Sequence, residues 1–164
     1  MIDIVCFPGK QLDLGFENVY QISEFRAVAA AKEEILQRAL QPKKTDFIYN
    51  LEDSKKEDKM NRRSSGLNQV YCKLAHDKGI AVAFNFNLVL HAENRDVILG
   101  RMMQNVRFCR KYKVKMIIAS FAINTYEQRA PNDLIAFGRC IGMTEKEAKD
   151  ALNFSRKTQL IQAR

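Results

Sequence analysis

The sequence has few of the residue patterns from which catalytic or metal sites are recognised. Its 164 residues include two histidines, His76 and His91, and no tryptophan. Two histidines cannot form the several-histidine cluster of a metal-dependent barrel hydrolase, and no HExxH or CxxC pattern replaces it. The seven glycines are dispersed and form neither a Walker loop nor a dinucleotide-binding fingerprint. The sequence therefore predicts no catalytic residues, no metal site and no bound cofactor for this chain.

Long apolar runs are also absent. No run approaches the roughly 20 residues that a transmembrane helix needs, and Asp3 interrupts the N-terminal apolar stretch, which argues against a signal peptide. The four cysteines are far apart, as is usual for reduced thiols packed in a core: Cys6, Cys72, Cys109 and Cys140. We therefore expect a cytoplasmic protein that does not enter a membrane, with one domain over 1–164.

The charge is the first functional signal. Lysine and arginine total 27 against 19 acidic residues, which gives a net charge of +8 and a pI near 9.4. An excess of this size favours a polyanionic partner, most often nucleic acid.

Short apolar runs alternate with helical patterns along the chain. The runs read as strands covered on both faces, because apolar and polar residues do not alternate within them: 2–7, 18–22, 46–50, 80–86 and 115–120. Helical spacing covers 23–40, 66–79, 94–113 and 132–142, and a capping box of Thr144 and Glu147 begins a further helix. Alternation of this kind predicts an α/β fold with mainly parallel strands and outer helices.

A charged segment, 51–65, interrupts this alternation. We expect it to be a long exposed loop. It follows a strand, so it belongs at the carboxyl side of the strands, where ligand sites of α/β proteins gather.

Several arginines also follow predicted strands. A parallel sheet would bring these residues to one edge, where the planar guanidinium group suits phosphate: Arg62, Arg63, Arg95 and Arg129. We add Lys73 and Lys113 as further candidates for RNA binding. Two alternatives stay open, a metal-dependent phosphoesterase with a barrel fold and a DNA-binding protein that uses the helix–turn–helix at 132–154. The acids of the last helix would repel phosphates, which argues against the second alternative.

An ordered set of motifs resembles archaeal ribonuclease P protein component 3, the thirty-kilodalton subunit family. The matching stretches are Gly66–Gln69, Lys111–Val114, Arg129–Leu134 and Ile141–Met143, and the likeness is convincing over 64–154. The resemblance implies a TIM-like (β/α) barrel. It also implies a protein subunit that binds ribonuclease P RNA and protein component 2, and through the complex precursor tRNA, whose 5′ leader the RNA removes. The chain would then have no active site of its own although it is part of an endoribonuclease, and Mg²⁺ would belong to the catalytic RNA.

The sequence departs from the family pattern in places. A first βα unit of the family is missing ahead of the strand at 2–7, so we expect an incomplete barrel with an open edge beside that strand. The family's Asp-His pair is Asn68-Gln69 here, and a basic residue before the final Asp-Leu is Asn132. Some RNA or partner contacts of the family are therefore expected to be lost or relocated.

Overall fold

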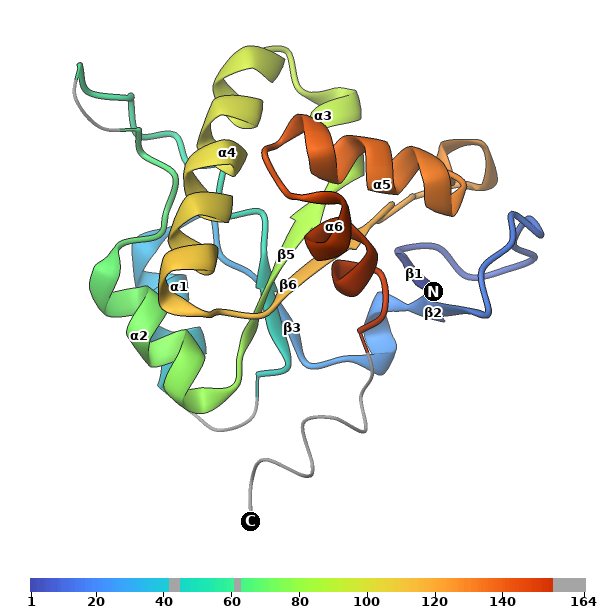
Figure 1. Cartoon of the computed structure of the whole chain (residues 1–164), viewed down its shortest axis with the longest axis horizontal. Coiled ribbons are helices and arrows are strands. Elements are labelled where there is room, and N and C mark those ends of the chain that lie inside the picture. The colour runs from blue at the N-terminus through green and yellow to red at the C-terminus, as the bar shows by residue number, and fades with distance from the viewer. Residues whose placement is uncertain (42–44, 61–62, 155–164) are drawn as a thin grey trace.

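Parallel strands and helices alternate in the structure (Figure 1), a computed structural model that describes residues 1–41, 45–60 and 63–154. The strands are β1 (Ile2–Val5), β2 (Asn18–Gln21), β3 (Ala27–Ala29), β4 (Phe47–Tyr49), β5 (Ala81–Asn85) and β6 (Met116–Ala119). The α-helices are α1 (Glu33–Leu40), α2 (Gln69–Lys78), α3 (Phe86–His91), α4 (Arg95–Tyr112), α5 (Pro131–Cys140) and α6 (Glu145–Ala151). Two short 3₁₀ helices are η1 (Ile22–Glu24) and η2 (Thr125–Glu127). None of the described helices is long and apolar enough to span a membrane.

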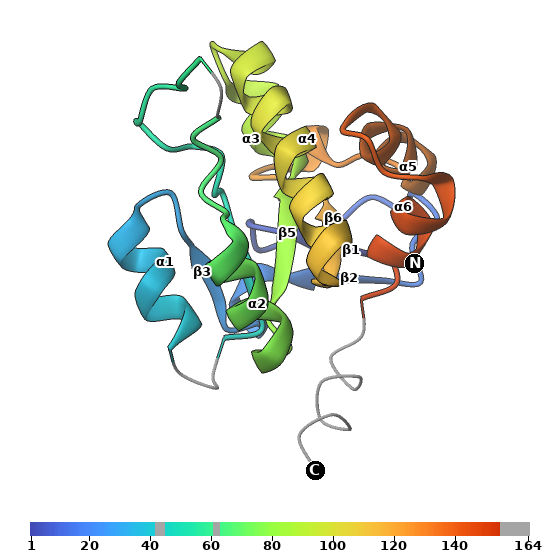
Figure 2. The same ribbon diagram turned by 60° about the vertical axis from the view of Figure 1, so that its left-hand side comes forward.

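The strands form a curved, incomplete barrel. Strands β3, β4, β5 and β6 pair in that order, β1 pairs with β2, and every one of these ladders is parallel. Two backbone hydrogen bonds join the two sheets: Phe121 N–H donates to Ile4 (2.9 Å) and Cys6 N–H donates to Ala122 (2.8 Å). Helices cover the outside of the curved surface (Figures 1 and 2). The predicted α/β, TIM-like architecture with parallel strands is confirmed.

The expected open edge beside strand 2–7 is wrong. Strand β1 pairs with β2 on one side, and the residues around Ile4 bond to the chain after β6 on the other. Among the strands that the structure describes, β1, β2, β3 and β6 each have one ladder partner, and the backbone hydrogen bonds between the β1 region and the chain after β6 cover the second edge of β1.

The predicted helix over 23–40 is also wrong in its first half, which contains η1 and β3. The carboxylate of Asp46 accepts a hydrogen bond from the backbone N–H of Arg26 (2.8 Å). It also forms an ion pair with the Arg26 guanidinium group (2.6 Å). These contacts hold the start of β3 beside β4, and the ladder hydrogen bonds outweigh the helix propensity of the alanines. The helix begins only at Glu33.

The strand predicted at 80–86 ends at Asn85 and turns directly into α3. The side chain of Asn85 caps this helix by accepting a hydrogen bond from Leu88 N–H (3.0 Å). Because no loop intervenes, α3 lies immediately at the carboxyl end of β5 (Figure 1).

Both faces of the sheet are buried, which explains why the strands do not alternate polar and apolar residues. The outer face packs against the helices through Ile48, Val82, Phe84 and Ile118. The inner face forms a second cluster in which aromatic rings lie over small side chains: Phe25, Phe47, Phe121, Ala81, Ala83 and Ala119. Tyr49 stacks on Phe121 with ring centroids 5.2 Å apart. The interior of the barrel is therefore filled with side chains.

A buried carboxylate joins β1 to the end of β6. Asp3 accepts hydrogen bonds from the Ser120 N–H (2.7 Å), the Ser120 hydroxyl (2.6 Å) and the Ile4 N–H (2.8 Å). Burial raises the pKa of Asp3, and the bonds from Ser120 and Ile4 partly oppose that rise.

Replacing this carboxylate tests its contribution to the fold. In Asp3→Ala the buried N–H and hydroxyl of Ser120 lose their acceptor, so we expect the free energy of unfolding at pH 7 to fall by about 3 kcal/mol. Urea denaturation measures the change. Asp13→Ala, in the exposed loop after β1, is the control and should have little effect. Equal denaturation midpoints for Asp3→Ala and wild type would contradict this role.

Candidate nucleic-acid interface

The loops that follow β4, β5 and β6 meet at one end of the sheet. Because these strands are parallel, their carboxyl ends lie at the same edge (Figure 1). We call the described residues 50–60, 63–65, 86–95 and 120–131 the carboxyl rim. This is the end of the barrel at which related architectures carry their sites.

The residues directly after the strands hydrogen-bond within the protein. Asn85 Nδ2 donates to Asn50 Oδ1 (2.8 Å), and the hydroxyl of Ser120 is held by Asp3. Burial, and next the charge of Asp3, raise the pKa of the Cys6 thiol, which disfavours the nucleophilic thiolate. Within 1–41, 45–60 and 63–154, no group of three or more His, Cys, Asp or Glu side chains could hold a metal ion. Asn85 and Ser120 are thus occupied by other groups of the protein.

Arg129 lies between η2 and α5, at the start of the helix that Pro131 begins. Its guanidinium group sits over the ring of Phe86, 5.3 Å from the ring centroid. Its Nη1 donates to the backbone carbonyls of Tyr126 (3.1 Å) and Gln128 (2.8 Å). Arg129 therefore joins the η2 loop to the first residue of α3.

Arg95 lies at the other end of α3. It is exposed, it is the first residue of α4, and its Nη2 donates to the carbonyl of Leu90 (2.8 Å). Arg95 and Arg129 therefore flank α3, as expected from their positions after strands.

Arg63 is exposed and lies against α4. A Cβ atom built on Gly100 would come within 1.9 Å of its Nη1, so the guanidinium occupies the space above that glycine. This places Arg63 beside α4, about one and a half turns after Arg95. Arg62, the fourth predicted arginine, lies outside the described residues.

The two predicted lysines lie away from the rim. Lys73 is exposed midway along α2. Lys113 follows α4 at the opposite end of the strands, with a positive φ of 56°, and its carbonyl lies 2.9 Å from His76 Nδ1. Arg63, Arg95 and Arg129 therefore lie in the segments at the carboxyl ends of the strands, and Lys113 lies at the opposite end.

Arg101 holds the charged loop after β4 in place through hydrogen bonds, a role that the sequence did not predict. Its side chain is buried within α4 and its guanidinium donates to three loop carbonyls at 2.5–2.8 Å and to Asp58 (2.9 Å). The three carbonyls belong to Glu52, Ser54 and Lys56. Most of the loop is exposed, as expected, but its start is buried and its path is fixed. The sequence feature that could have indicated this role is the position of Arg101, a cation next to Met102 on the apolar face of α4.

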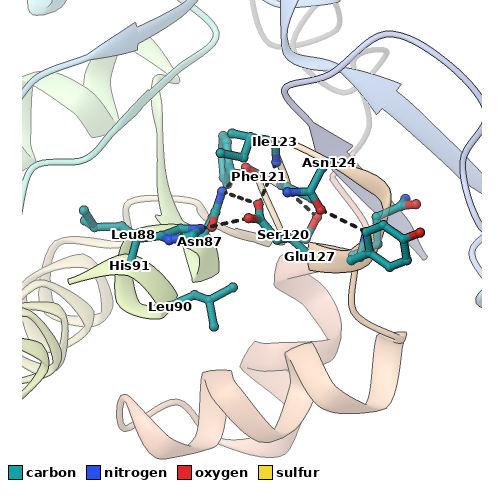
Figure 3. Close-up of polar contacts among 12 residues, drawn as sticks. Asn87, Leu88, Leu90, His91, Ser120, Phe121, Ile123, Asn124 and Glu127 are labelled. Carbon is teal, nitrogen blue, oxygen red and sulfur yellow. Dashed lines mark hydrogen bonds and ion pairs between the residues drawn. The ribbon is translucent and has the colours of Figure 1, made fainter. Parts of the chain in front are cut away.

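Glu127 connects α3 with the loop after β6 on the carboxyl rim (Figure 3). Its carboxylate lies 2.9 Å from His91 Nε2 and accepts hydrogen bonds from Asn87 Nδ2 (3.1 Å) and the Ile123 N–H (3.0 Å). Burial acts to raise the pKa of Glu127, but the bonds from Ile123 and His91 outweigh it and lower the pKa. This network couples α3 to the η2 loop. His91 is the last residue of α3.

The helix pair proposed for DNA binding belongs to the outer layer of the barrel. A Cβ atom on Gly138 of α5 would come within 2.5 Å of Ile118 in β6 and 2.9 Å of Ala148 in α6. The capping box of Thr144 and Glu147 forms as predicted. Close packing on β6 disfavours a projecting recognition helix.

The family model of the RNase P subunit p30 matches residues 4–162. The chain belongs to this family. The resemblance found in the motifs is therefore confirmed, and the p30 family accounts for almost the whole sequence.

Curated relatives of this p30-family chain are similar over a little more than half of its length. Ribonuclease P protein component 3 of Methanosarcina mazei is 37% identical over 93 residues, which is 56% of this chain and 39% of that protein. The Thermococcus kodakarensis protein of the same name is 34% identical over 99 residues, 59% of this chain and 45% of that protein. Each match thus spans less than half of the relative's length.

A solved structure shares the fold more completely. A chain in the cryo-EM structure of archaeal ribonuclease P with mature tRNA superposes with a TM-score of 0.73 at 19% identity. The superposition covers 99% of this chain and 91% of that chain. The likeness shows that the two chains share a fold.

The buried end of the rim loop gives a pH-dependent prediction. Asn105 Nδ2 donates to Glu52 Oε1 (2.6 Å), and burial raises the pKa of Glu52 from 4.5 to about 7. The folded protein therefore holds the proton more tightly than the unfolded chain. The stability contributed by protonated Glu52 is full below about pH 4.5 and is lost as the pH rises to about 7.

We expect Glu52→Gln to remove this pH dependence. Relative to wild type, the variant should gain stability between pH 4.5 and 7, by at most about 3 kcal/mol at about 1.4 kcal/mol per pKa unit. Urea denaturation at several pH values measures the difference, with Glu57→Gln in the exposed part of the loop as control. A constant difference between Glu52→Gln and wild type across this range would contradict the buried titration.

Proposed function

We propose that this protein is a subunit of ribonuclease P and assists the catalytic RNA in removing the 5′ leader of precursor tRNA. The family match over 4–162 carries the proposal. Proteins similar to it are named ribonuclease P protein component 3, and a chain of the same fold occurs in archaeal ribonuclease P with mature tRNA. In this proposal the RNA performs the cleavage, Mg²⁺ belongs to the RNA, and this chain binds no cofactor.

The chemistry of the carboxyl rim supports an RNA-binding role. Arg63, Arg95 and Arg129 hold planar cations at the end of the barrel, in a chain with a net charge of +8. Each of the three is positioned by a neighbouring residue or backbone carbonyl, so little order has to be gained on binding. We assign RNA phosphates to these three arginines, and extend the assignment to Arg62.

We also propose that this chain binds protein component 2 and that it is located in the cytoplasm. Lys73 and Lys113 lie off the rim, so they are better placed to contact such a protein partner, or a second part of the RNA, than the phosphates at the rim. All four cysteines are free thiols, and Cys72 and Cys109 are buried, which suits a reducing compartment.

Recovery of bound RNA from native extract tests the proposed function. The tagged full chain should enrich ribonuclease P RNA above all other transcripts, and protein component 2 should copurify. Enrichment of another RNA class, or of DNA in preference to RNA, would contradict the proposal.

Removal of the rim arginines tests where the RNA binds. Arg95→Ala and Arg129→Ala should each weaken RNA binding for all sequences. Each should also reduce the slope of log K against log salt by about one, because a protein with one phosphate contact fewer releases fewer counterions when it binds. Salt titrations of the reconstituted complex measure the slope.

The control is Lys149→Ala in α6, which removes one positive charge from an outer helix. Lys32 is not a suitable control, because it is the N-cap of α1, in the short segment between β3 and α1, and therefore lies near the rim. An unchanged salt slope for both arginine variants, with a reduced slope for Lys149→Ala, would place the RNA elsewhere.

A further inference from the structure

One aromatic side chain stands out on the carboxyl rim. The side chain of Tyr126, in η2, is 92% exposed, whereas its neighbours in the chain after β6, Phe121 and Ala122, are fully buried. Ile123, in the same loop, is 58% exposed. An aromatic ring that is solvated to this degree adds little to the core, so its faces are free to contact a partner.

The backbone beneath this ring is held firmly. The Asn124 side chain accepts a hydrogen bond from Tyr126 N–H (3.0 Å), and Arg129 Nη1 donates to the Tyr126 carbonyl (3.1 Å). On either side, Glu127 accepts from the Ile123 N–H, and the Gln128 side chain accepts from the Leu12 N–H (2.9 Å). Figure 3 shows Asn124, Ile123 and Glu127 on the same short loop. The ring is thus exposed on a loop whose path is fixed from both sides.

The charges around the ring favour RNA over a protein as the occupant. Arg129 bonds to the backbone of Tyr126, and Arg95 lies at the far end of the adjoining α3. The carboxylate nearest in sequence, Glu127, turns inward and is occupied by Asn87 and His91. An exposed aromatic ring beside arginines is the chemistry with which proteins bind unpaired nucleotides.

We propose that Tyr126 stacks on an unpaired base of RNA, and that Arg129 binds a phosphate of the same strand. The proposal rests on the proposed function, because it specifies which feature of the RNA meets the rim. The stacking partner is a base outside a duplex, since paired bases in an RNA helix do not offer a free face.

Three variants at one position separate stacking from simple apolar contact. Tyr126→Phe keeps the ring, Tyr126→Leu keeps apolar area without a π face, and Tyr126→Ala removes both. The probe is a single-stranded RNA 12-mer with a central 2-aminopurine, whose fluorescence is quenched by stacking, and a duplex of the same sequence is measured beside it. The full chain is used throughout, and Val70→Ala, an exposed residue of α2, is the control.

Wild type and Tyr126→Phe should quench the fluorophore. Tyr126→Ala and Tyr126→Leu should not, and should bind the single strand about 5- to 100-fold more weakly, which corresponds to one stacked base. Duplex binding and the Val70→Ala control should be unchanged. If Tyr126→Ala misfolds, the comparison of Phe with Leu still decides the result.

Other outcomes would overturn the stacking proposal. Equal binding and quenching by all variants, or no quenching by wild type, would show that the ring does not stack on a base. Loss of component 2 binding with unchanged RNA binding would make Tyr126 a protein contact. Each of these results leaves the proposed function intact, whereas failure to recover ribonuclease P RNA from extract would remove the function itself.

Discussion

The packing of aromatic rings against alanines inside the barrel is the contact on which the rest of the structure depends. Phe47 and Phe121 fill the space that Ala81, Ala83 and Ala119 leave free on neighbouring strands. Each buried ring contributes a few kcal/mol, and a larger side chain in place of an alanine would force the strands apart. Because side chains fill the interior, a partner at the carboxyl end of the barrel would contact the loops and not the inside of the barrel.

Two polar residues turn this end of the barrel into a defined surface. Arg101 fixes the loop after β4 from within α4, and Glu127 fixes the loop after β6 against α3. Long loops ordinarily lose much conformational entropy when they bind a partner. Loops that are already held by buried hydrogen bonds lose less, so the cations and the aromatic ring at the rim are presented in one geometry.

The sequence was sufficient for much of the fold. Local patterns predict the strands at 46–50 and 115–120 and the capping box at Thr144, and the structure contains them. Strand β3 could not be predicted, because its alanines favour a helix, and the ladder with β4 and the contacts of Asp46, twenty residues later, hold the segment extended. Helix α3 could not be predicted either, because its apolar residues directly follow those of β5 and no turn residue separates the two elements.

The candidate site was predictable in outline. Arginines after parallel strands must reach the same edge, and Arg63, Arg95 and Arg129 do so, whereas Lys113 follows a helix and lies at the other end. Arg101, Glu127 and Tyr126 were missed because their roles depend on burial and on contacts between distant segments.

Hydrogen exchange of the full chain with and without ribonuclease P RNA tests most directly whether the carboxyl rim faces the RNA. The account predicts slower amide exchange in 86–96 and 121–131 when RNA is bound, with little change in the outward turns of α2 and α6. Protection confined to α2 and α6, with the rim exchanging at the same rate in both states, would contradict it.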